Sequence, residues 1–325
     1  MATDARLKRR WLYLPFVVAA FVMGGYALLW RAGAGEMKKA IALWAEDQRA
    51  AGLDVSYSDL KADGFPFFLR VHVEKPEIIA PGQLHWRTDR LTLDTLPYDL
   101  TRLIFSVRSE QQLGLAEYGD WRINAETFRF SIANDKTRDW AFSMNIDGAT
   151  ALRGANPASA SLNRLVFDLA PSPADKTTLV LSLAADGFAV EDEERSARLD
   201  SVETLMAATQ MQAISHASLW RQAGGELKIN GLNARLDEAK LSVNGALSLD
   251  ASHHPVGALN TEITSPGPFA EALAQLGIMS EQEAQSAAAA LSLVAIAGGG
   301  KITAPIEFSN GAAHLSGVKI MELKD

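Results

Sequence analysis

Histidine and cysteine, the residue types that most often carry chemistry, are scarce in this chain. It has six histidines and no cysteine, which excludes disulfides, thiolate zinc sites, iron–sulfur clusters and cysteine nucleophiles. No histidine pair has the H-x-x-x-H or HExxH spacing that places two ligands on one helix face. His253 and His254 adjoin each other before Pro255 and indicate a solvated turn, and His72 falls on the polar side of a strand. We therefore predict no metal site.

Three short motifs resemble reactive sites without completing one. The acidic run lacks the alternation and the glycine of a calcium loop, and the glycine run before Lys301 lacks the Ser or Thr that binds magnesium. An S-x-x-K pattern has no S-D-N or K-T-G partner. A carboxylate pair formed between strands stays open, but we predict a protein that is not an enzyme and binds no cofactor. The three runs are 191–194, 298–301 and 58–61.

Length and charge narrow the class of protein further. The chain has 325 residues, 48% of them hydrophobic, and a formal net charge of −8. This length suits two domains or one elongated β-rich domain with a sizeable core. The acidic balance argues against a nucleic-acid partner, because binding to phosphates needs a basic surface.

Residues 11–30 contain no charged side chain and form the longest apolar stretch. About 20 residues at a rise of 1.5 Å span about 30 Å, the thickness of the hydrocarbon layer. We predict a single-pass helix within an N-terminal unit of residues 1–31. The basic residues before it favour a cytoplasmic N-terminus, and its aromatic side chains suit the two interfaces. The predicted anchor residues are Trp11, Tyr13, Phe16, Phe21, Tyr26 and Trp30.

The alternative for this segment is a cleaved signal peptide. Ala32, Gly33 and Ala34 have the small side chains that a signal peptidase accepts. A cleavable apolar region is usually about 7 to 15 residues long, so the length of this one favours a retained anchor.

The body, residues 32–325, changes from helical to strand periodicity. After an amphipathic helix over 36–51, apolar residues alternate with polar ones in many short runs, among them 67–73, 103–107, 128–132, 140–146 and 179–183. Helices are predicted near 215–225, 266–276 and 280–297, the last opened by a capping box of Ser280 and Glu283. We predict a mainly β fold of the α+β class, with a large, mostly antiparallel, curved sheet and a few inserted helices. A division into two halves would fall near 151–175.

Two of these strands have an apolar face that could line a groove for lipid. The groove requires that the sheet curve without a second layer that closes it; otherwise the same residues form an ordinary core under the inserted helices. The candidate groove residues are Phe67, Leu69, Val71, Val73, Trp140, Phe142, Met144 and Ile146.

Several longer motifs carry a resemblance to a known family. They are GFPFFLRV (64–71), LHWR with Trp86, LWRQAGGELKI (219–229), LSVNGALSLDASHHPVGALNTEI (241–263) and API-x-F-x-NG-x-x-x-L (304–315). Together they resemble the domain of unknown function 2125 family and cover nearly all of the body. The resemblance implies an uncharacterised envelope protein of Gram-negative bacteria, anchored in the inner membrane with its body in the periplasm. More remotely, the strand repeats resemble those of AsmA-like proteins, which are implicated in outer-membrane lipid homeostasis.

These observations favour a non-catalytic function. The first hypothesis is a module that binds or transfers a lipid or another apolar ligand of the envelope. The alternative is a scaffold that docks another envelope protein. The predicted partners are thus the membrane, a lipid or an envelope protein.

Overall fold

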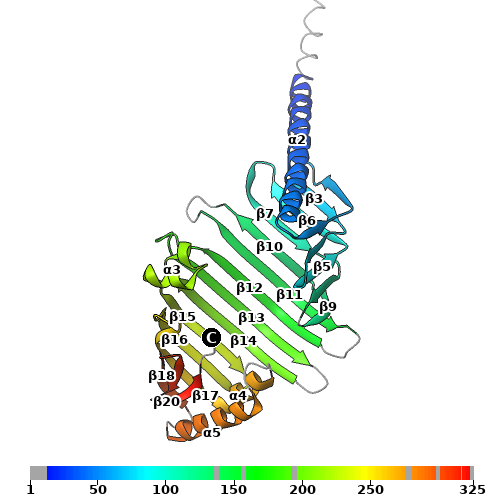
Figure 1. The fold of residues 1–325 in the computed structure, drawn as a ribbon. Helices are drawn as coiled ribbons and strands as arrows, with labels where there is room; N and C mark the ends of the chain where they lie inside the picture. Colours follow the sequence, from blue (N-terminus) through cyan, green and yellow to red (C-terminus); the bar gives the residue numbers. More distant parts are fainter. Residues whose placement is uncertain are drawn as a thin grey trace, which may run out of the picture.

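The computed structural model describes residues 13–116, 118–134, 139–154, 159–191, 196–275, 280–297, 301–315 and 317–322. A long N-terminal helix enters one end of a large twisted sheet, and shorter helices lie at the other end (Figure 1). The sheet is antiparallel throughout its described pairings, which confirms the predicted fold class.

The N-terminal helix, α2 (Leu14–Ala50), joins the predicted span and the predicted amphipathic helix into one element. The small residues between them permit this, because they neither break the helix nor keep it away from the body. A β-carbon on Gly33 would lie 3.1 Å from Leu69 Cδ1, and Ala34 is buried. Gly52, with a φ of +96°, follows the C-terminus of the helix, as the sequence predicts.

The first nine strands form the half of the sheet near α2. They are β1 (Asp54–Ser56), β2 (Asp59–Asp63), β3 (Leu69–Glu74), β4 (Glu77–Ala80), β5 (Leu84–Thr88), β6 (Arg90–Leu96), β7 (Asp99–Val107), β8 (Gln111–Leu115) and β9 (Gly119–Asn124). They make two branches, β2-β3-β6-β7 and β1-β4-β5-β8-β9. The branches meet at β11, which pairs with β9 at one end and, through β10, with β7 at the other.

The remaining strands continue the sheet as one antiparallel series. They are β10 (Thr127–Ala133), β11 (Ala141–Arg153), β12 (Ser159–Pro171), β13 (Leu179–Glu191), β14 (Ser196–Ala208), β15 (Leu227–Leu236), β16 (Ala239–Leu249), β17 (Pro255–Thr264), β18 (Lys301–Ser309), β19 (Ala312–Leu315) and β20 (Val318–Glu322). The end of β11 and all of β12 fall within 151–175. The meeting of two halves there stays a prediction.

The three predicted helices lie where the sequence places them, and a short 3-10 helix, η1, precedes the first of them without having been predicted. They are η1 (Met211–Ala213), α3 (Ala217–Gln222), α4 (Pro266–Gln275) and α5 (Glu281–Ala297). Helix α5 packs on β18, where Ala295 and Ile302 are buried with Leu315. Trp220 of α3 is buried and donates a 2.6 Å hydrogen bond to the Thr209 carbonyl. The helices thus cover the far end of the sheet.

One predicted strand begins later than its alternation suggests. Phe67 belongs to a turn, and β3 starts only at Leu69. Gly64 has a φ of +97°, and its carbonyl accepts hydrogen bonds from the amides of Phe67 and Phe68. The turn therefore takes Phe67 out of the strand, and its side chain is 73% exposed.

Candidate functional site

Six neighbouring strands, β7 and β10–β14, place apolar side chains in three rows across one face of the sheet. Residues directly opposite each other on antiparallel strands share a face, so the pairing register defines the rows. We call this set the apolar face, and Thr204 is its one polar member. The rows are Val107, Phe128, Ile146, Leu165, Ala185 and Val202; Phe105, Phe130, Met144, Phe167, Leu183 and Thr204; and Leu103, Ile132, Phe142, Leu169, Leu181 and Met206.

The exposure of these side chains shows that no second layer of described residues closes over them. Val107 and Ala185 are buried, Ile132 is exposed, and the other members of the rows are half-buried. Half-burial is what neighbours within the same layer produce. Under a true cover a side chain becomes inaccessible, as Ile302 beside α5 does at 1% exposure. Figure 1 likewise shows no helix in front of β10–β13.

An aromatic series crosses the apolar face from strand to strand. The rings of Phe105 and Phe130 stack with centroids 4.5 Å apart, Phe142 lies 6.2 Å from Phe130, and Phe167 meets Phe142 edge-on at 6.0 Å. Such ring contacts add about 0.5 to 1.5 kcal/mol each beyond burial. The series holds β7, β10, β11 and β12 together and keeps the face smooth and apolar.

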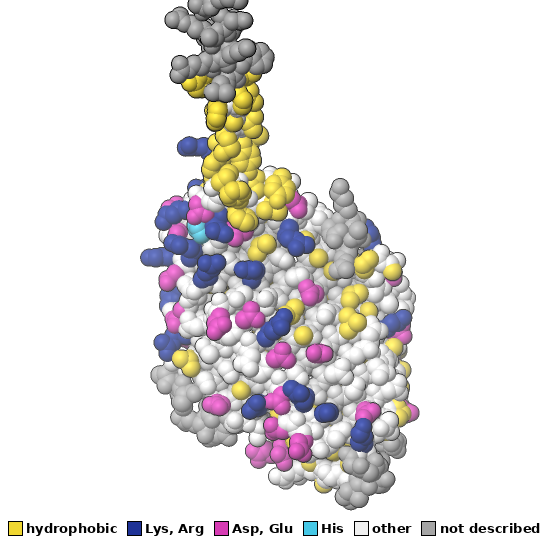
Figure 2. All heavy atoms as spheres, turned by 180° about the vertical axis from the view of Figure 1, so that it is seen from behind, with side chains coloured by type: hydrophobic (Ala, Val, Ile, Leu, Met, Phe, Trp, Pro, Cys, Tyr) yellow, Lys and Arg dark blue, Asp and Glu magenta, His cyan; other side chains and the backbone are white. Residues whose placement is uncertain are grey.

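The opposite face of the same strands is polar. Residues such as Ser143, Asn145 and Asp168 alternate with the apolar ones, and the Ser143 hydroxyl donates a 2.6 Å hydrogen bond to the Asp168 carboxylate. Figure 2, seen from behind, shows charged side chains of both signs scattered over the body and few hydrophobic ones. A hollow of about 530 Å³ with side chains of both charges, among them Glu203 and Arg235, lies over β14–β18. The two faces of the sheet thus differ sharply in chemistry.

The predicted groove residues separate into two groups. Leu69, Val71 and Val73 are buried at 3%, 0% and 5% exposure on β3, the strand against which α2 packs, so they form closed core. Phe142, Met144 and Ile146 belong to the apolar face, and Trp140 is half-buried just before β11. Phe67 lies in the turn near α2 and not on either face.

The predicted anchor residues lie along α2, except for Trp11, which is outside the described residues. Tyr13, Phe16 and Phe21 are 55%, 71% and 79% exposed, as expected of side chains with no protein around them. Tyr26 and Trp30 instead contact the turn before β3. The helix is long and apolar enough to cross a membrane, and its most apolar window is not buried within the protein.

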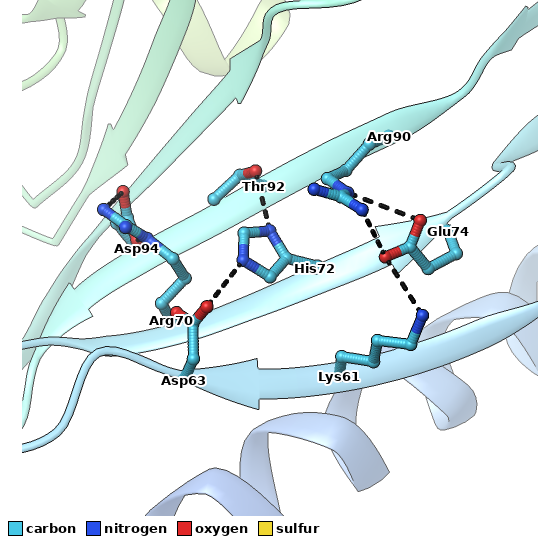
Figure 3. A network of polar contacts seen from close by, with 8 residues as sticks. All are labelled: Lys61, Asp63, Arg70, His72, Glu74, Arg90, Thr92 and Asp94. Carbon is cyan, nitrogen blue, oxygen red and sulfur yellow. Dashed lines mark hydrogen bonds and ion pairs between the residues drawn. The ribbon is translucent and has the colours of Figure 1, made fainter.

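The densest polar network joins β2, β3 and β6 (Figure 3). His72 contacts Asp63 Oδ2 through Nε2 and Thr92 Oγ1 through Nδ1, each at 3.0 Å. Carboxylate, imidazole and hydroxyl in this order resemble a nucleophilic triad. However, the three lie side by side on the polar face of adjacent strands, and they line neither of the described hollows. The arrangement fits a cross-strand ladder better than a catalytic cleft.

Ion pairs extend this ladder on both sides of His72. Arg70 donates hydrogen bonds to both oxygens of Asp94, at 2.6 and 3.0 Å, and this contact raises the pKa of the guanidinium. Glu74 pairs with Arg90 at 3.0 Å and with Lys61 at 3.5 Å. The hydrogen bond from Arg90 lowers the pKa of the Glu74 carboxyl below its usual value, with Lys61 adding to the effect. The network thus fixes the strands nearest the anchor.

Within the part of the chain that the structure describes, the other chemical candidates add no reactive site. Among the described residues, no group of three or more His, Asp or Glu side chains could hold a metal ion. His85 pairs with Glu77 at 2.8 Å, and Ser58 hydrogen-bonds the Glu74 carbonyl, so the S-x-x-K pattern is part of the β1–β3 region. Residues 192–194 and 298–300 lie outside the described residues.

The sequence missed the extent of the apolar face. Alternation marks each strand, but Phe105, Phe130 and Phe167 join the candidate residues only through the pairing register. The turn over residues 64–68 before β3 was also missed, although Gly64 and Pro66 signal a turn in GFPFF.

A long apolar N-terminal helix followed by a single curved antiparallel sheet, apolar on one face and polar on the other, defines the architectural class. The model of a bacterial family described as "Uncharacterized protein conserved in bacteria (DUF2125)" matches residues 30–324. The chain therefore belongs to this family. No curated protein and no solved structure matches the chain.

Proposed function

We propose that this protein is a non-catalytic module that binds, and passes on, the acyl chains of envelope lipids along the apolar face. In this proposal α2 holds the protein in the inner membrane, and the sheet stands in the periplasm. The observation that carries the proposal is an apolar layer three rows deep over which no second layer of described residues closes.

The dimensions of the apolar face suit an acyl chain. Six strands spaced about 4.8 Å apart extend over about 24 Å, and three rows at alternate residues are about 14 Å wide. One leaflet of the hydrocarbon layer is about 15 Å thick, so an acyl chain that spans a leaflet fits along the roughly 24 Å length of the rows. The footprint, on the order of 300 Å², reaches the size at which apolar patches on proteins are often functional.

The orientation follows from the charges that flank the helix. Arg6, Lys8, Arg9 and Arg10 precede the apolar stretch, and cationic flanks favour the cytoplasmic side. Because the chain has no cysteine, a Ser252→Cys variant carries a single thiol in the exposed β16–β17 turn. We expect a membrane-impermeant maleimide to label this thiol in intact cells. Labelling only after lysis would mean that the body lies on the cytoplasmic side, which would contradict the proposed orientation.

A photo-crosslinking experiment tests lipid binding with a matched control. Benzoylphenylalanine is introduced at Met144, at the centre of the apolar face, or at Asn145, the next residue on the polar face. We expect irradiation of cells to attach phospholipid at position 144 and not at 145, with the adduct identified by its mass. Equal yields at both positions, or no adduct, would contradict the proposal.

The same experiment distinguishes the scaffold alternative. A protein adduct at position 144 in place of a lipid would mean that the apolar face docks an apolar segment of an envelope protein. The remote resemblance to AsmA-like proteins favours lipid and stays a prediction.

A further inference from the structure

Large apolar side chains gather where α2 enters the body. In the turn before β3, residues 64–68, Phe65, Phe67 and Phe68 are 44%, 73% and 46% exposed. We call this segment the aromatic turn. Figure 2 shows hydrophobic side chains at the base of the helix that continue its apolar surface onto the body. Aromatic side chains this exposed indicate contact with something other than water.

A second exposed apolar segment lies beside the aromatic turn. Leu69, which follows the turn, pairs with Thr95 near the end of β6. The connection from β6 to β7 therefore lies next to it. Tyr98 in this connection is 82% exposed, and Leu100 at the start of β7 is 64% exposed. The two segments together form an apolar rim at the end of the body that faces α2.

Hydrogen bonds and ring contacts hold the aromatic turn against α2 at the level of Tyr26 and Trp30. Trp30 Nε1 donates a 2.7 Å hydrogen bond to the Phe68 carbonyl, and Tyr26 donates one to the Pro66 carbonyl. The Phe65 ring lies 5.9 Å from the Tyr26 ring and 5.8 Å from the Trp30 ring. The polar groups of both anchor side chains are thus satisfied by the protein itself, as a site with little water requires.

This height coincides with the end of the apolar stretch. Arg31, directly after Trp30, is the first charged residue along the described part of α2. Tyr26 lies four residues before Trp30, which is about 6 Å farther along the helix axis toward the N-terminus. Interfacial apolar groups reach about 5 to 10 Å into the boundary between headgroups and acyl chains. In a bilayer that the apolar stretch crosses, the aromatic turn would lie at the depth of this layer.

We propose that the aromatic turn and the tip of the β6–β7 connection insert into the interfacial layer of the bilayer that α2 crosses. This inference rests on the membrane span of the proposed function. It seats the body directly on the membrane, with no free stalk between them. Strand β7 then runs from the interface into the apolar face, and Leu103, the first member of the face along this strand, lies about 14 Å from the start of β7. An acyl chain leaving the bilayer would have a short path to the rows.

Single cysteines in the otherwise cysteine-free full chain test the insertion. Phe67→Cys and Tyr98→Cys report on the rim, Phe21→Cys on the span, and Ser252→Cys on a remote polar turn. Each variant is labelled with the fluorophore NBD and reconstituted in nanodiscs of phosphatidylethanolamine and phosphatidylglycerol. Lipids with a spin label high on the acyl chain quench fluorophores in the interfacial layer and are used for positions 67, 98 and 252. Lipids with the label near the end of the acyl chain quench fluorophores at the centre of the bilayer and are used for position 21, which lies about 14 Å deeper than Trp30.

We expect at least a twofold loss of emission at positions 67 and 98 and no loss at 252. If positions 67 and 98 emit like 252, the insertion is wrong, whatever position 21 shows. If emission at 67 is blue-shifted but not quenched, the turn is covered by protein, which also overturns the inference. Position 21 separately decides the span: quenching at 67 and 98 without quenching at 21 keeps the insertion and removes the transmembrane anchor.

Discussion

A carboxylate at the centre of the apolar face should abolish lipid binding while leaving the sheet folded. Met144 lies between Phe130 and Phe167 on the neighbouring strands, so Met144→Asp places a charge under any bound acyl chain. An aspartate in the middle of an apolar layer costs about 2.5 to 3.5 kcal/mol on the membrane-insertion scale. At about 1.4 kcal/mol for each factor of ten, the affinity should fall by about 60-fold to 300-fold.

The control is the same substitution one residue later. Asn145→Asp adds an identical charge to the same strand, but on the polar face, opposite Arg129 of β10. Its effect on lipid affinity should be less than about twofold, since the charge lies on the far side of the sheet from the bound chain and opposite a cation. The Oδ1 atom of Asn145 is buried without a hydrogen-bond partner, so any cost of the added charge should appear in the stability of the sheet. The assay titrates purified full-length protein with a fluorescent phosphatidylethanolamine, and a thermal melt of each variant verifies the fold.

The comparison of the two variants refutes the reasoning under two conditions. If Met144→Asp binds the fluorescent lipid as tightly as the natural chain and melts at the same temperature, the apolar face does not hold acyl chains. If Asn145→Asp loses as much affinity as Met144→Asp, the loss follows from net charge and not from the face.

Three further substitutions test the packing of the body by thermal or denaturant unfolding. Gly33→Leu should lower stability by about 1 to 3 kcal/mol, because its side chain would collide with a buried leucine of β3, whereas Gly35→Leu, with open space around it, should be neutral or slightly stabilising. Gly245→Ala should cost a similar amount, since a β-carbon there would lie 2.4 Å from a backbone oxygen of β17, and Gly231→Ala, with no atom within 4 Å, is its control. Glu74→Gln should destabilise the protein at neutral pH, because the lowered pKa of Glu74 means that its ionised form favours folding above about pH 4.5. The difference in melting temperature between the natural chain and the variant should close as the pH falls through the lowered pKa of Glu74. A difference that is constant with pH would contradict this.

The sequence predicts most of the fold because local patterns encode its elements. Alternation marks the strands, and the capping box of Ser280 and Glu283 marks the start of α5. The predicted span and the predicted helix over 36–51 form one helix, since Ala and Gly residues continue a helix when packing against β3 supports them. Phe67 leaves its predicted strand because the hydrogen bonds to Gly64 form a turn that alternation does not reveal.

The candidate site could be predicted only in part, for a related reason. Phe142, Met144 and Ile146 are apolar by alternation alone, but whether they are core or surface depends on what covers them. Val71 has the same local pattern and is inaccessible, because α2 packs against its strand. Pairing register and coverage are long-range properties, so periodicity identifies an apolar face without distinguishing an open one from a closed one.

The open apolar face has an energetic consequence that joins it to the membrane. A footprint on the order of 300 Å² corresponds to about 8 kcal/mol of apolar burial when it is covered, at about 25 cal/mol per Å². This is within the range of the net stability of a whole domain, so a face left in water would invite association with other apolar surfaces. In the arrangement that we propose, the aromatic turn seats the sheet beside the bilayer, and acyl chains are within reach to cover the face. The anchor, the turn and the apolar face would then act together, with the membrane both holding the protein and supplying its ligand.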